Sequence, residues 1–150
     1  MPIKHPNLHL ERMNGAIPAW HGKIAGDDLF AICENVRDGG GRLVALWGSD
    51  ERGDGKAGFA LHVVLVNETG LVCLSVALPA EQPSYPDISR IFPAANRMQR
   101  AAYDLLGLYA HEGHDHRKWL RHGAWHSGSF PLRKDFDVVA SGSPLPNPLP

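Results

Sequence analysis

The sequence predicts an α+β domain in which two main helices pack on a small mixed or antiparallel sheet, followed by an irregular C-terminal extension. Apolar residues recur with helical spacing over 28–38 and again over 94–106. Between these segments, apolar runs at 59–66 and 71–78 are joined by a four-residue turn, which is typical of a hairpin. A chain of 150 residues has room for one such domain.

The first helix is expected over 28–38. The residues before 26 predict no long element, because Gly15, Pro18 and Gly22 interrupt them. Asp27 or Asp28 can cap the helix, and three glycines at 39–41 end it because glycine has low helix propensity. Four apolar side chains fall on one helical face: Leu29, Ile32, Cys33 and Val36.

Three strands are expected next, at 43–47, 59–66 and 71–78. The polar turn at 49–56 reverses the chain after the first strand, and the turn at 67–70 connects the other two. The second and third strands are apolar over most of their length rather than strictly alternating. We therefore expect part of the sheet to be covered on both faces.

Four prolines between 79 and 93 predict an extended crossing without a helix. The second helix is expected over 94–106, with Pro93 before its start and Gly107 in the left-handed position after its end. The domain is expected to reach residue 136, and the proline-rich segment 137–150 to form a flexible tail. The predicted core contains Leu29, Ile32, Val63, Leu65, Val72, Leu74, Leu105 and Leu106.

Composition and charge argue against several functional classes. Fifteen Lys and Arg stand against sixteen Asp and Glu, without a basic run, so no nucleic-acid partner is expected. Cys33 and Cys73 give no Cys-x-x-Cys pair and are expected to be buried thiols rather than metal ligands. No apolar run reaches the roughly 20 residues of a bilayer span, and no secretory signal is recognised. We expect a cytoplasmic protein that holds no cofactor and meets a membrane only through a partner.

The histidine-rich segment 111–116 raises the hypothesis of a metal site. His111, His114 and His116 are spaced closely enough to converge on one ion, Asp115 could add an oxygen ligand, and His122 and His126 follow. Gly113 interrupts any helix that would align these side chains, so a metalloprotease motif is not formed. The ordinary alternative is a polar loop with solvent-exposed histidines. A stand-alone metal-binding module therefore remains the alternative function.

The segment 130–136 alternates apolar and charged residues where no helix or sheet is predicted. Leu132 and Phe136 can act as apolar anchors, while Arg133 can pair with a carboxylate. The surface that receives this strip is either another protein or this domain itself, in which case the strip is an edge strand.

Three motifs carry a family resemblance. They are the Pro-Asp-Ile-Ser-Arg-Ile-Phe-Pro run beginning at 86, Asp-Leu-Leu-Gly at 104–107, and Pro-Leu-Arg-Lys-Asp-Phe at 131–136. Together they resemble the C subunit of respiratory complex I (NADH:quinone oxidoreductase) and the related domain of membrane-bound [NiFe] hydrogenases and formate hydrogenlyase. The family has Glu-Arg-Glu where this chain has Gln99, Arg100 and Ala101, and its Gly-His-Pro is represented one place late by Gly113 and His114 without the proline.

The resemblance implies an accessory subunit without its own flavin, cluster or quinone, docked against a large subunit and a small iron–sulfur subunit. It also implies a position peripheral to the inner membrane through that complex. The run around Trp119 and Trp125 favours the hydrogenase branch. The implied docking residues are Arg100, Asp104, Arg117, Leu132, Arg133, Lys134, Asp135 and Phe136. A small enzyme of unknown reaction is the third hypothesis, for which the sequence names no nucleophile and base.

Overall fold

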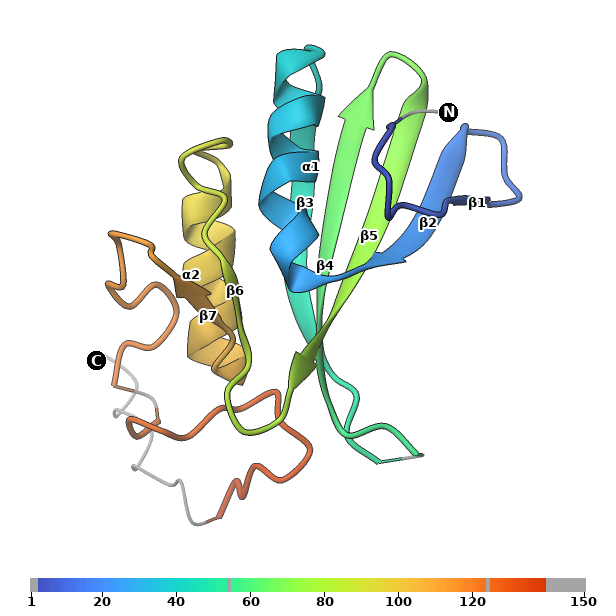
Figure 1. Ribbon diagram of the computed structural model, residues 1–150. Helices are drawn as coiled ribbons and strands as arrows, with labels where there is room; N and C mark the ends of the chain where they lie inside the picture. Colours follow the sequence, from blue (N-terminus) through green and yellow to red (C-terminus); the bar gives the residue numbers. More distant parts are fainter. Residues whose placement is uncertain (1–2, 54, 124, 140–150) are drawn as a thin grey trace.

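Five strands form one sheet, and both helices pack against the same face of it (Figure 1). The computed structural model describes residues 3–53, 55–123 and 125–139, so most of the expected tail, 140–150, lies outside the described residues. The strand order is β1-β2-β5-β4-β3, with β2 and β5 parallel and the other pairs antiparallel. The α+β class with a mixed sheet is therefore confirmed.

The sequence did not predict the first two strands. β1 (Glu11–Arg12) pairs with β2 (Ala19–Ile24), which lies beside β5. Gly22, which we interpreted as an interruption, lies inside β2. A Cβ there would come within 2.7 Å of the His9 carbonyl oxygen, so the glycine allows a close backbone approach. Because its main partner strand lies about fifty residues further along the chain, β2 has little local signal.

The three predicted strands are present, and each is longer than expected: β3 (Arg42–Asp50), β4 (Gly58–Asn67) and β5 (Gly70–Pro79). Asn67 pairs with Gly70 across the predicted hairpin turn. Over 61–66 on β4 and 72–79 on β5, buried side chains alternate with half-buried or exposed ones, and both helices lie on the buried side. We expected part of the sheet to be covered on both faces, but neither helix covers the second face. Cys73, on the uncovered face, is half-buried rather than fully buried, unlike Cys33.

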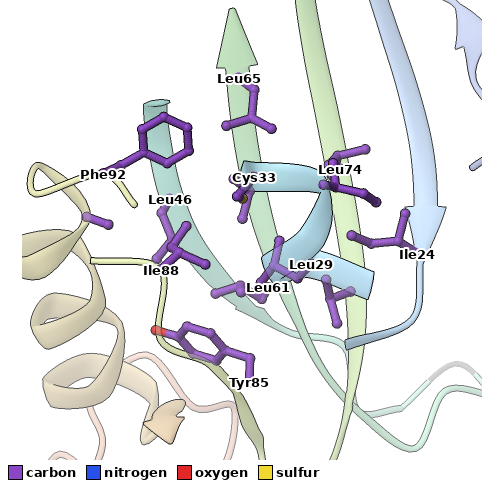
Figure 2. Packing of buried hydrophobic residues seen from close by; sticks show 14 of the residues in the cluster. Ile24, Leu29, Cys33, Leu46, Leu61, Leu65, Leu74, Tyr85, Ile88 and Phe92 are labelled. Carbon is purple, nitrogen blue, oxygen red and sulfur yellow. The ribbon is translucent and has the colours of Figure 1, made fainter. Parts of the chain in front are cut away.

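Helix α1 (Gly26–Asp38) begins two residues earlier than predicted and buries the four expected side chains. Figure 2 shows two of them, Leu29 and Cys33, among the core side chains of the sheet. The predicted aspartate cap is wrong, because the N-cap residue is Ala25 and no side chain caps the helix. Asp27 and Asp28 lie in the first turn, where negative charge favours the helix dipole. The Asp28 carboxylate accepts a hydrogen bond from the Asn7 amide at 3.3 Å instead.

Helix α2 (Ala95–Leu106) ends at Gly107, which has a φ of +76° as predicted. Leu106 is buried, but Leu105 is only half-buried, because adjacent helical residues point about 100° apart. The segment 79–93 contains no helix, as predicted, but it is extended only in part, because the backbone turns at 88–92. It contains β6 (Ser84–Pro86), which pairs in parallel with β7 (Tyr109–His111), a strand that we did not predict.

Candidate functional site

Asp104 on α2 is buried, with only 4% of its surface exposed, and it binds the backbone of a distant loop. One carboxylate oxygen, Oδ2, accepts hydrogen bonds from three successive backbone N–H groups. The donors are Trp119 at 2.7 Å, Leu120 at 2.7 Å and Arg121 at 3.2 Å. A carboxylate that accepts several N–H bonds satisfies donors that would otherwise be buried without partners. Asp104 therefore fixes the path of the loop.

Arg100 lies one helical turn before Asp104, on the same side of α2. Its Nε donates to the Arg117 carbonyl at 2.7 Å, and its Nη2 donates to the Lys118 carbonyl at 3.0 Å. Arg100 thus binds carbonyl oxygens of the segment whose N–H groups Asp104 binds. Because the loop has no regular secondary structure, Arg100 supplies donors for its carbonyl oxygens and Asp104 supplies an acceptor for its N–H groups.

Arg117 itself points outward, with 78% of its side chain exposed. Its guanidinium donates twice to Asp115, each time at 2.8 Å, and the Asn96 amide donates to the same carboxylate at 3.1 Å. The hydrogen bonds from Arg117, above all, hold the pKa of Asp115 below its usual range. The Asp115 charge is therefore bound within the loop.

The strip 130–136 lies on its own domain as a series of turns, so the edge-strand alternative is wrong. Arg133 donates from Nε to the Leu106 carbonyl at 2.8 Å, and its guanidinium lies 4.8 Å from the ring centroid of Phe59 and 4.3 Å from that of Phe130. Burial lowers the pKa of Arg133. Arg133 forms no ion pair with a carboxylate among the described residues. It closes the end of α2, where the helix leaves carbonyl oxygens without partners, and its pairing with a carboxylate of a partner stays a prediction.

The neighbouring charges of the strip bind the turn between β3 and β4. Asp135 pairs with Arg52 at 2.8 Å, and the Lys134 ammonium donates to the Arg52 carbonyl at 2.6 Å. The Lys134 backbone N–H donates to Asp50 at 2.9 Å. Arg52 also donates to Asp50, and that hydrogen bond above all keeps the pKa of Asp50 well below its usual range.

Between these contacts, Leu132 is 56% exposed although its backbone N–H donates to the Leu105 carbonyl at 3.0 Å. Phe136 is partly buried. Of the two proposed apolar anchors, Leu132 therefore offers the freer side chain.

Sequence reasoning did not find Asp50 and Arg52 as site residues, because they read as polar turn residues and their partners lie more than eighty positions away. It also missed the buried pair Asp87 and Gln99. The Gln99 amide donates to Asp87 and its oxygen accepts from the Ile88 N–H. Burial would raise the pKa of Asp87, but hydrogen bonds from Gln99 and Ser89 outweigh burial and lower it.

The histidines of the loop do not converge. His116 lies on Tyr109, with the rings stacked 5.0 Å apart, and its Nε2 lies 2.8 Å from the Gly113 carbonyl oxygen, to which it donates. His114 is exposed. Within the described part of the chain, no group of three or more histidine, cysteine or acidic side chains is placed to hold a metal ion. The geometry does not favour the metal-binding alternative.

A second polar cluster crosses the sheet face that carries no helix. Ser49 donates to Glu51 at 2.6 Å, and the ring of His62 lies between Ser49 and Ser75, at 2.8 and 2.9 Å. Since the Ser49 proton goes to the Glu51 carboxylate, His62 Nε2 donates to Ser49 and Nδ1 accepts from Ser75. Burial lowers the pKa of His62. In this tautomer His62 Nε2 carries a proton, so it cannot accept one from Ser49 as a general base would. The groove of about 850 Å³ that His62 and Ser75 help to line therefore has no activated serine at Ser49.

The α2 contacts and the strip both fall in the part of the chain that matches a known protein family. Residues 23–141 match the family described as "Respiratory-chain NADH dehydrogenase, 30 Kd subunit". The chain belongs to this family. The resemblance drawn from the three sequence motifs is confirmed, and so is its extension to formate hydrogenlyase.

Family relatives include both oxidoreductase types. The chain is 32% identical over 110 residues to the C/D protein of the NADH-quinone oxidoreductase of Rhodopseudomonas palustris, a match over 68% of this chain and 19% of the relative. It is 34% identical over 99 residues to formate hydrogenlyase subunit 5 of Escherichia coli, over 64% and 17%. With the C subunit of the Moorella thermoacetica NADH-quinone oxidoreductase it shares 28% over 121 residues, covering 79% and 80%. The match thus spans about a fifth of the longer relatives and most of the shorter one.

Solved structures show the same fold. A chain of the membrane-bound sulfane sulfur reductase, an archaeal respiratory membrane complex, superposes with a TM-score of 0.73 at 18% identity, over 90% of this chain and 80% of that one. The trypsin-resistant fragment of Nqo5 gives 0.61 at 19%, over 72% and 89%. The family and its relatives indicate a component of complex I-like or hydrogenase-like respiratory complexes. Among the described residues, no helix has the length and apolar character needed to cross a bilayer.

Proposed function

We propose that this chain is a non-catalytic docking component in the hydrophilic arm of a complex I-like NADH:quinone oxidoreductase or a membrane-bound [NiFe] hydrogenase. It binds the large subunit and the small iron–sulfur subunit. It meets the membrane on the cytoplasmic side, through that complex alone.

One observation carries the proposal. The charged residues of the family motifs, Arg100, Asp104 and Arg133, bind backbone groups of this same chain, in the loop 117–121 and at the end of α2. They therefore shape an irregular surface, and no substrate is needed to explain their burial. A loop with a fixed path presents its side chains without a large ordering cost on binding, which is the requirement for a docking surface.

The relatives support the same function. In the Rhodopseudomonas protein the matching segment is about a fifth of a longer polypeptide whose name combines the letters C and D. The equivalent of this chain is therefore covalently joined there to a second component. A domain that is fused to its partner in one protein is expected to contact the equivalent partner non-covalently in another.

Within the docking surface, Leu132 is the exposed apolar contact and Phe136 the partly buried one, while Lys134 and Asp135 hold the strip against Arg52. Arg100, Asp104 and Arg133 act on the partner through the backbone they position. Arg117, exposed at the loop, reaches the partner directly.

The test is co-purification of the full chain with the large and iron–sulfur subunits encoded by the same organism. We expect the three chains to elute together from a size-exclusion column. Leu132→Asp should weaken this association by about tenfold, because an apolar contact is replaced by an unpaired charge. Ile17→Asp is the matched control, since Ile17 is 63% exposed and lies in the turn between β1 and β2. Elution of the unaltered chain apart from both subunits would refute the proposal.

A further inference from the structure

The loop 117–121 is turned with its backbone toward α2. Arg100 donates hydrogen bonds to the carbonyl oxygens of Arg117 and Lys118, and Asp104 accepts hydrogen bonds from the N–H groups of the next three residues. With these polar backbone atoms turned toward α2, the side chains of 117–120 are exposed and that of Arg121 is half-buried. The loop therefore displays most of its side chains to solvent, although it lies directly on a helix.

The displayed side chains combine positive charge with apolar area. Arg117 and Lys118 are exposed, and the large apolar side chains of Trp119 and Leu120 are 38% and 40% exposed. Arg97 on α2 extends this surface, since its guanidinium lies 5.0 Å from the centroid of the Trp119 ring.

Arg100 lies 5.3 Å from the same centroid, so the indole contacts two arginines. Trp119 is thereby held in place before any partner arrives. Tryptophan and arginine are the residues that contribute most often to binding at protein interfaces.

The carboxylates near this surface are already bound. Asp104 is buried under the loop, and Asp115 is bound by Arg117 and Asn96 with Arg100 at 3.7 Å. Arg117 and Asp115 form an ion pair and offset each other, whereas no salt bridge among the described residues involves Arg97 or Lys118. These two cations are therefore not offset within the surface, although the chain as a whole has a net charge of −1. The positive charge is a property of this surface and not of the composition.

We propose that Arg97, Arg117, Lys118 and Trp119 form the contact for an acidic surface on a partner subunit, with Trp119 in an apolar recess of that partner. This inference rests on the proposed docking function and names the charge that the partner must carry. A protein fits better than a polyanion, because the centre of the surface is an ordered aromatic ring with a leucine beside it and the basic residues are few.

The experiment compares two double variants with the same change in charge. Arg97→Glu with Lys118→Glu reverses two cations of the surface, neither of which binds the loop backbone through its side chain. Arg12→Glu with Arg42→Glu reverses two exposed cations on β1 and β3. Binding of each variant chain to the complex purified without this chain is measured by calorimetry at low and high salt.

We expect the Arg97→Glu/Lys118→Glu chain, the surface variant, to bind the complex at least about tenfold more weakly and its binding to lose most of its dependence on salt. The Arg12→Glu/Arg42→Glu control should bind as the unaltered chain does. Trp119→Ala should weaken binding as well, and Trp119→Phe should restore part of it. The melting temperature of each variant shows whether it is folded.

Three results would overturn the inference. Equal binding by the surface variant would remove this surface from the interface and leave the docking function intact, whereas failure of the unaltered chain to bind would overturn both. Binding of the unaltered chain to phosphatidylglycerol vesicles that is lost in the surface variant, with partner binding unchanged, would assign the surface to anionic lipid instead.

Discussion

Arg133 offers the most direct test of how the strip is held. In Arg133→Ala the Leu106 carbonyl loses its donor at 2.8 Å, and the rings of Phe59 and Phe130 lose the guanidinium that lies on them. A hydrogen bond from a charged donor contributes about 1.5–3 kcal/mol. Each guanidinium–ring contact contributes about 0.5–2 kcal/mol. Because Arg133 is partly exposed, we expect a loss in unfolding free energy of about 2–3 kcal/mol.

The assay is urea unfolding of the full chain followed by circular dichroism, with Arg12→Ala as the control at an exposed position. For a chain of this size, the loss of stability corresponds to a fall in melting temperature of roughly 5–10 °C. Arg133→Lys should recover little, because an ammonium group cannot reproduce the planar contacts with both rings. An unchanged unfolding midpoint in Arg133→Ala would refute the conclusion that Arg133 stabilises this domain. Direct contact with a partner would then be the better explanation of its role.

Three further predictions follow from single contacts. Asp104→Ala should leave three N–H groups without an acceptor and make the loop 117–121 cleavable by trypsin at protease concentrations that spare the unaltered chain. His62 has a lowered pKa in the folded state, so stability should fall as the pH drops below about 6.5, and this part of the pH dependence of the urea midpoint should disappear in His62→Gln. Gly107→Ala should lower the melting temperature, because φ is +76° and the new Cβ would lie 2.5 Å from Arg133 Nη2; an unchanged value would contradict this geometry.

Local signals were sufficient for much of the fold. The apolar spacing in α1, the turn at 67–70 and the glycine after α2 each describe interactions between residues close in sequence, and the structure has all three elements. Local signals were not sufficient to predict the strand β2. Its pairing with β5 joins distant segments, and the glycine inside it resembles a breaker until its backbone neighbour His9 is known.

The site divides in the same way. The motifs led to a set of candidate docking residues, and most of these lie around α2 and in the strip. Their bonding partners could not be predicted. Arg133 was expected to meet a carboxylate and instead binds the Leu106 carbonyl, while Asp135 meets Arg52. An arginine side chain reads the same in sequence whether it binds a carboxylate or a backbone carbonyl, and only spatial proximity distinguishes the two.

The sequence by itself determined the α+β class, the hairpin, the main core positions and membership of the family, because these depend on local periodicity and on motifs. Only the tertiary structure decided that Asp104 and Arg100 hold the loop 117–121 with its backbone against the helix. That arrangement depends on hydrogen bonds to backbone groups 15 to 18 residues away along the chain, and no pattern within the loop encodes it. The exposed Trp119 and its arginines are the direct result of that bonding.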